Sequence, residues 1–172
     1  PNDFRIDFGP PTEGNAVIFA RDSVFRFQGG NQKSAQFQRN MLTLLTGGLH
    51  HLPYDTVLAR LRAAKFDLAL FREDVWQGRP AYVVGAMRND YQSEQFWVDR
   101  QHLYLLRTVT MLPGGHLQEA RFGKHVRAAG GWCETEVLFL LDGQRRQVEN
   151  YQQVRANAAL PEGLFAAGQF GK

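Results

Sequence analysis

Five histidines are the first residues that could carry chemistry: His50, His51, His102, His116 and His125. A protein zinc site needs three or four ligands that converge on one point. His50 and His51 are neighbours in a predicted loop, and the other three fall in separate turns or at strand ends. We therefore expect solvent-facing histidines and no metal site.

A nucleophile or an acid–base pair is the second possibility. Cys133 is the only cysteine, and no histidine lies at a spacing that is typical of a Cys–His catalytic pair. We therefore expect Cys133 to be a small buried residue and not a nucleophile. Glu134 and Glu136 share one face of a predicted strand, where paired carboxylates could do acid–base work, but a solvated strand face has the same pattern. The sequence also has no glycine-rich phosphate loop and no G-x-S-x-G elbow. We expect no catalytic residue and no cofactor.

The stretch 95–112 predicts two neighbouring antiparallel strands joined by the polar residues 99–102. Side chains on a strand point alternately to opposite faces, and both sets are largely apolar in the second strand. Strands of this kind are typical of a sheet that is covered on both sides. We expect this pair to form the centre of the protein.

Two amphipathic helices are predicted between the first strands and the later ones. The first follows Ser34, a plausible N-cap, and places four apolar residues on one side: Phe37, Met41, Leu44 and Leu45. The second opens at Pro53 and Asp55, with Val57, Leu58 and Leu61 on one side. Their order excludes a doubly wound α/β fold, in which helices and strands alternate one by one.

These elements predict an α+β fold with a curved antiparallel sheet running from Phe4 to Arg155. The sheet would form an unclosed β-barrel, or half-barrel, with both helices packed on its concave face. A chain of 172 residues fits one domain with a real core. The expected architecture therefore leaves a cleft between the helices and the sheet.

Composition narrows the possible partners. Twenty Lys and Arg residues oppose 17 Asp and Glu residues without forming a patch, so we expect no nucleic-acid partner. No apolar run is long enough to span a bilayer, and a single cysteine excludes an internal disulfide. A monomer is expected.

The apolar residues are the part of the sequence that indicates a function, because a cleft lined by Phe, Leu and Met can bind aliphatic ligands. The same side chains could instead fill a solid core, and that alternative stays open. The predicted cavity wall draws on both helices and on the strands that follow them: Phe37, Met41, Leu44, Leu45, Leu58, Leu61, Leu103, Leu105, Val109 and Leu138.

Several segments, in this order, resemble the bacterial outer-membrane lipoprotein carrier family, which has the LolA/LolB-like fold. They are PNDFRIDFGP, AVIFARDSVFRF, the predicted helix pair, PAYVVGA, QFWVDRQHLYLLR and VRANAALPEGLF. The resemblance covers nearly the whole chain. It implies a single domain over residues 1–172 that lacks the family's N-terminal helix and first strands. The family's lid arginine would precede Pro1, so the lid latch is not carried over.

The resemblance implies a periplasmic, non-enzymatic protein that binds acyl chains of lipids or of lipidated proteins. Such a protein acts as a carrier or acceptor in transport to the outer membrane, with a membrane protein as a further partner. A lipidated cysteine upstream of this sequence would anchor it to the outer membrane. Two alternatives stay open: an envelope sensor or scaffold domain of the same fold that binds proteins, and, least favoured, a hydrolase using a histidine or glutamate.

Overall fold

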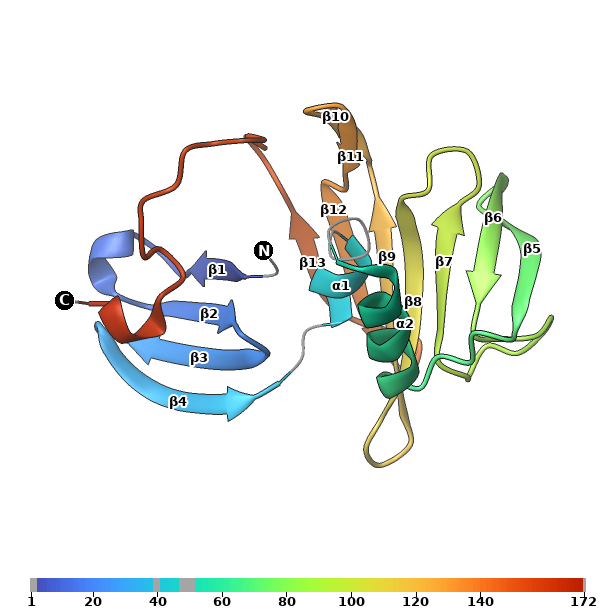
Figure 1. Ribbon diagram of the computed structural model, residues 1–172, viewed down its shortest axis with the longest axis horizontal. Helices are drawn as coiled ribbons and strands as arrows, with labels where there is room; N and C mark the ends of the chain where they lie inside the picture. Colours follow the sequence, from blue (N-terminus) through green and yellow to red (C-terminus); the bar gives the residue numbers. More distant parts are fainter. Residues whose placement is uncertain (1–2, 39–40, 47–51, 172) are drawn as a thin grey trace. The chain divides into compact units, whose positions relative to one another are not determined.

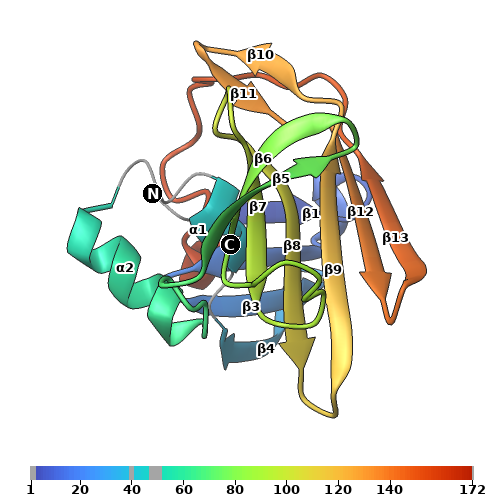
Figure 2. The same ribbon diagram turned by 90° about the vertical axis from the view of Figure 1, so that its right-hand side faces the viewer.

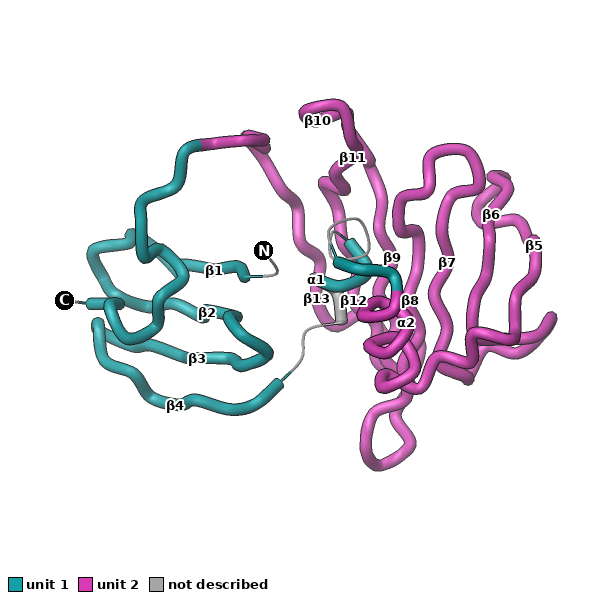
Figure 3. The backbone as a smooth tube through the Cα atoms, in the orientation of Figure 1, with its two compact units in different colours: residues 1–54, 159–172 teal, residues 55–158 magenta. Residues whose placement is uncertain are grey.

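Strands dominate the computed structural model, which describes residues 3–38, 41–46 and 52–171 and, for 41–43, the backbone only (Figure 1). In this part of the chain the strands form a four-stranded, a seven-stranded and a two-stranded sheet, and all their pairings are antiparallel. The chain divides into two compact units: Pro1–Tyr54 with Ala159–Lys172, and Asp55–Ala158 (Figure 3).

The first unit holds the four-stranded sheet, with strands in chain order: β1 (Phe4–Asp7), β2 (Ala16–Ala20), β3 (Ser23–Gln28) and β4 (Asn31–Phe37). Arg21 and Asp22 both have positive φ angles, of 51° and 58°, which the tight β2–β3 turn requires. Short 3₁₀ turns lie at Pro11–Glu13 and Ala167–Gln169, and helix α1 spans Met41–Thr46.

The C-terminal segment completes the core of the first unit. Ala167 packs with Ile18, Ala20 and Phe27 in one buried cluster. The ring of Phe170 lies 4.3 Å from that of Phe27. The short tail therefore covers one face of a sheet whose strands lie more than a hundred residues earlier in the chain.

The second unit holds helix α2 (Tyr54–Ala63), from Asp55 onward, and the seven-stranded sheet, whose strand order is β13-β12-β9-β8-β7-β6-β5. These strands are β5 (Phe71–Trp76), β6 (Arg79–Val84), β7 (Gln95–Asp99), β8 (Leu105–Leu112), β9 (His116–Gly123), β12 (Glu136–Leu141) and β13 (Gln144–Asn150). β10 (Val126–Ala128) and β11 (Gly131–Cys133) form a separate small hairpin. Since β5 and β13 each pair with one neighbour, the sheet is unclosed.

The two faces of the seven-stranded sheet have different neighbours. On one face, Trp76 of β5 lies 5.6 Å from Trp97 of β7 and contacts Arg121 of β9, so the sheet curves around that face. On the other face, Phe66 follows α2 and sets its ring edge-on against Phe96 of β7 at 5.2 Å. Figures 1 and 2 accordingly show α2 beside one face of this sheet.

The predicted fold class is confirmed: the protein is α+β, with antiparallel, unclosed sheets and few helices. The predicted position of the second helix is wrong, because α2 lies, through Phe66, on the face opposite to the one around which the sheet curves. The predicted single sheet from Phe4 to Arg155 is divided instead, because among the described residues β4 pairs only with β3 and β5 only with β6. No helix of the described part is long and apolar enough to cross a membrane.

The prediction of a helix that begins after Ser34 is wrong. Residues 31–37 form β4 and pair with β3, with Ala35 opposite Phe25. The turn at Gly29-Gly30, where both φ angles are positive, returns the chain directly into this hairpin. Helix α1 begins only at Met41, and the predicted stop at Gly47-Gly48 lies outside the described residues. The second predicted helix is confirmed as α2.

Candidate functional site

The residues predicted to line a cavity lie in several places. Phe37 ends β4 and is 74% exposed, while Leu44 and Leu45 of α1 are buried. The side chain of Met41 lies outside the described residues. Leu61 of α2 is buried and Leu58 is half-buried. Phe37, Leu44 and Leu45 belong to the first unit and Leu58 and Leu61 to the second, so whether they share a cavity stays a prediction.

The predicted strand residues do not share one face of the sheet. A bulge in β8 places Leu105 opposite Val98, whereas Val109 lies opposite Gln95. Because Val98 and Gln95 are three residues apart on β7, Leu105 and Val109 point to opposite faces. Leu138 shares the face of Val109, through its pairing with Arg121. Leu103 lies in the turn before β8, 56% exposed and with a φ of 59°.

A cavity of about 610 Å³ lies in the second unit where β5 begins, β6 ends, β7 begins and β8 ends. We call it the strand-end cavity. Its lining combines four apolar side chains with five polar or charged ones and one glycine: Lys65, Asp67, Leu70, Gly85, Gln92, Ser93, Glu94, Met111, Leu112 and Pro113.

Gly85 is needed where two walls of the strand-end cavity meet. Its φ is 99°, and a Cβ atom there would lie 2.2 Å from the carbonyl oxygen of Glu94. Its backbone N–H donates to the carbonyl of Leu70 at 2.9 Å, which ties the start of β5 to the end of β6. Only glycine allows this close approach of backbone segments.

Glu94 is the half-buried charged group of the strand-end cavity. Its Oε1 accepts a hydrogen bond from the backbone N–H of Met111 at 2.9 Å. Burial raises the pKa of the Glu94 carboxyl, although the bond from Met111 and the charge of Lys65 act in the opposite direction. Lys65 acts at a distance, since no described cation forms an ion pair with Glu94. The cavity thus combines an apolar wall with one incompletely compensated carboxylate.

Beside this cavity, the curved face of the sheet carries a stack of arginine and tryptophan side chains. The Arg107 guanidinium lies 5.1 Å from the ring centre of Trp76 and 5.4 Å from that of Trp97. Arg72 lies 5.0 Å from the Trp97 ring on the other side. Cation–π contacts of this kind strengthen when they are desolvated. The stack joins β5 to β9 across this face, so it is a packing feature of the sheet.

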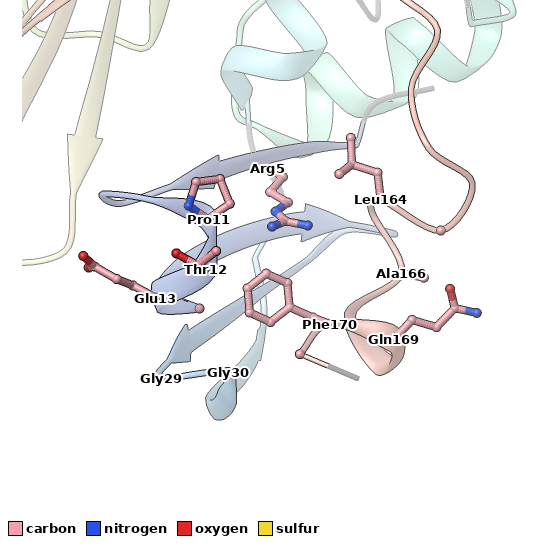
Figure 4. Close-up of a pocket in the computed structure, with 13 residues that line it drawn as sticks. Arg5, Pro11, Thr12, Glu13, Gly29, Gly30, Leu164, Ala166, Gln169 and Phe170 are labelled. Carbon is pink, nitrogen blue, oxygen red and sulfur yellow. The ribbon is translucent and has the colours of Figure 1, made fainter.

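A second cavity, of about 360 Å³, lies in the first unit beside the C-terminal segment (Figure 4). Gly14, Gly30 and Gly171 pack backbone against backbone along it, since a Cβ at Gly14 would lie 2.3 Å from the nitrogen of Gly30. The Arg5 guanidinium lies 4.5 Å from the Phe170 ring and is held by Asp7 through Nε and Nη2. This polar, backbone-lined cavity is poorly suited to an aliphatic chain.

The residues considered for metal or acid–base chemistry lie apart. The described residues contain no group of three or more His, Cys, Asp or Glu side chains arranged to hold a metal. His116 pairs with Asp142 at 2.8 Å on the surface, and His125 stacks on Tyr104 at 3.7 Å, where burial lowers its pKa. Burial raises the pKa of Cys133, which disfavours the reactive thiolate. His50 and His51 lie outside the described residues.

Sequence reasoning missed the residues of the strand-end cavity. Met111 falls in the predicted central strands, whereas Glu94, Leu70 and Lys65 are not among the predicted site residues. The available signal was Gly85, which interrupts an apolar strand and so indicates a close backbone approach. The partner in that approach depends on the register between β6 and β7, which the sequence alone does not supply.

The fold and these cavities define an α+β protein with antiparallel, unclosed sheets and two separate candidate sites. No family model matches the chain, and no curated protein matches it. Its structure is similar to the crystal structure of the LolA superfamily protein NE2245 from Nitrosomonas europaea. The TM-score is 0.44 and the sequence identity 14%, over 88% of this chain and 69% of that one.

Proposed function

We propose that the protein binds acyl chains of lipids or of lipidated proteins in its second unit and releases them chemically unchanged. It would act in the periplasm as a carrier or acceptor during transport to the outer membrane. The periplasmic location and the transport role come from the sequence resemblance alone. The binding site proposed here is the strand-end cavity.

The observation that carries this proposal is the apolar wall of the strand-end cavity. Leu70, Met111, Leu112 and Pro113 line it, and Met111 is 40% exposed although it is a large apolar side chain. A ligand that covers such side chains gains hydrophobic free energy that water cannot supply. The cavity is large enough for a segment of an aliphatic chain.

The expected affinity follows from the methylenes that the ligand buries. Each buried CH₂ contributes ~0.8 kcal/mol, so eight would give roughly 6 kcal/mol before the cost of association is subtracted. The net affinity of a single chain would then be modest. Modest affinity suits a protein that must also release its ligand.

The test is a matched pair of substitutions on one sheet. Met111→Glu introduces a charge into the cavity wall, while Val148→Glu introduces the same charge on β13 at an almost equal exposure of 41%. We expect Met111→Glu to reduce binding of an uncharged fluorescent fatty alcohol at least tenfold, because the ligand would have to desolvate the new carboxylate. Val148→Glu should leave binding within twofold of the parent protein.

Urea unfolding of both variants checks that each one is folded. The proposal fails if the parent protein binds no fluorescent fatty alcohol, or if both variants lose binding equally. Native mass spectrometry of the purified protein, with and without added lipid, gives an independent readout of an occupied site.

A further inference from the structure

The strand-end cavity carries more negative than positive charge. Its lining holds one cation, Lys65, and two carboxylates, Asp67 and Glu94. Asp67 is exposed and accepts a hydrogen bond from the backbone N–H of Ala69 at 3.0 Å. Glu94 is half-buried and lies beside apolar side chains. An anionic head group would meet two carboxylates there, whereas a cationic one would gain from them.

Glu94 is the carboxylate best placed to receive such a group. The hydrogen bond from Met111 fixes its Oε1, and no described residue donates to its Oε2. Met111 is also part of the apolar wall, so the hydrogen bond holds the carboxylate beside the place where a chain would lie. Burial raises the pKa of Glu94, and a cation bound beside the carboxylate would favour its ionised form.

We infer that the ligand of this cavity is an amphiphile with a protonated amine at its polar end. Its chain lies against Leu70 and Met111, and the amine donates to Glu94. This inference rests on the proposed acyl-chain binding and adds the chemical class of the head group. A charge-assisted hydrogen bond at a half-buried carboxylate gives both affinity and orientation.

The experiment compares three ligands with the same twelve-carbon chain at pH 7, below the concentration at which they form micelles. They are dodecylamine, dodecanol and dodecanoate, and calorimetric titration measures the dissociation constant of each one. We expect dodecylamine to bind at least tenfold more tightly than dodecanol, and dodecanoate to bind more weakly than dodecanol.

Two substitutions assign the preference to one carboxylate. Glu94→Gln removes the charge but keeps an oxygen that can accept from Met111, so the variant should remain folded, with an unchanged urea midpoint as the check. It should lose the tenfold preference for the amine, so that dodecylamine and dodecanol bind within twofold of each other. Asp67→Asn, in the same lining, should keep most of the preference.

The outcomes separate this inference from the proposed function. Dodecanol binding without any preference for the amine, or a preference that survives Glu94→Gln, overturns the head-group assignment and leaves acyl-chain binding in place. Absence of binding by all three ligands overturns both proposals.

Discussion

Arg107 and Glu119 form a buried ion pair between the neighbouring strands β8 and β9, with 2.6 Å from Arg107 Nε to Glu119 Oε1. Both side chains are 8% exposed. Arg121 donates to the same oxygen at 2.7 Å. The pair also holds Arg107 in place above the rings of Trp76 and Trp97, so one carboxylate anchors the whole stack on the curved face.

Replacing Glu119 by Gln should therefore be costly. It leaves Arg107 buried without its counter-charge, and breaking a buried pair in this way costs about 3 kcal/mol of unfolding free energy. The matched control is Glu136→Gln, which breaks the pair with Lys124, where the side chains are 65% and 34% exposed. That change should cost less than about 1 kcal/mol in urea unfolding. Equal costs for the two variants would contradict a central role for Glu119.

Stability should also depend on pH through Glu119. Burial alone would raise its pKa, but hydrogen bonds from Arg121 and Arg107 outweigh burial and hold the pKa below the ordinary value of 4.5. A lowered carboxyl pKa contributes stability that is present above about pH 4.5 and is lost as pH falls through the folded-state value. The difference in unfolding free energy between the parent protein and Glu119→Gln should thus shrink from pH 7 to pH 3. A constant difference would assign the cost to packing.

Trp76 should hold the edge of the seven-stranded sheet. Its ring contacts Trp97, Arg107 and Arg121, whereas the adjacent Val75 is 60% exposed on the opposite face. Trp76→Ala should cost about 3 kcal/mol and speed amide hydrogen exchange in β5 and β6, while Val75→Ala should cost less than about 0.5 kcal/mol. Unchanged exchange in Trp76→Ala would show that the β5–β6 hairpin is held by other contacts.

Alanine substitutions at two glycines of the first unit should distinguish the cost of a steric clash from the cost of a left-handed backbone conformation. Gly14 and Gly29 have similar positive φ angles of 65° and 57°, so Ala pays the same left-handed cost of about 1 kcal/mol at either position. A Cβ at Gly14 would lie 2.3 Å from the nitrogen of Gly30, whereas Gly29 has open space. Gly14→Ala should therefore lower the thermal midpoint clearly more than Gly29→Ala. Equal shifts would mean that the loop moves aside without penalty.

The strands 95–112 could be predicted from the sequence because their signals are local. Gln95–Asp99 and Leu105–Leu112 alternate over the length of a strand, and a polar turn joins them. The strand at residues 31–37 could not be predicted, because the apolar residues at 37, 41, 44 and 45 have the spacing of one face of a helix. The pairing of residues 31–37 with β3 satisfies the backbone and overrides that pattern.

The strand-end cavity could not be predicted for a different reason. Its walls depend on which segments approach one another: Gly85 with Glu94, Leu70 with Gly85, and Glu94 with Met111. These contacts follow from strand register and from one positive φ angle. The bulge opposite Val98 likewise sends Leu105 and Val109 to different faces, although their even spacing in the sequence suggests the same face.

The first unit is built from two segments that are synthesised at different times, because the second unit lies between them in the sequence. The strands β1–β4 leave the ribosome before the second unit, whereas Ala167 and Phe170, which cover Phe27, leave it only after the whole of Asp55–Ala158. The second unit is continuous in sequence and can complete its own contacts in the meantime. Until Ala167 and Phe170 emerge, the nascent chain presents one uncovered apolar sheet face. Chaperones can bind such a surface, and a stop before Ala167 would leave it exposed permanently.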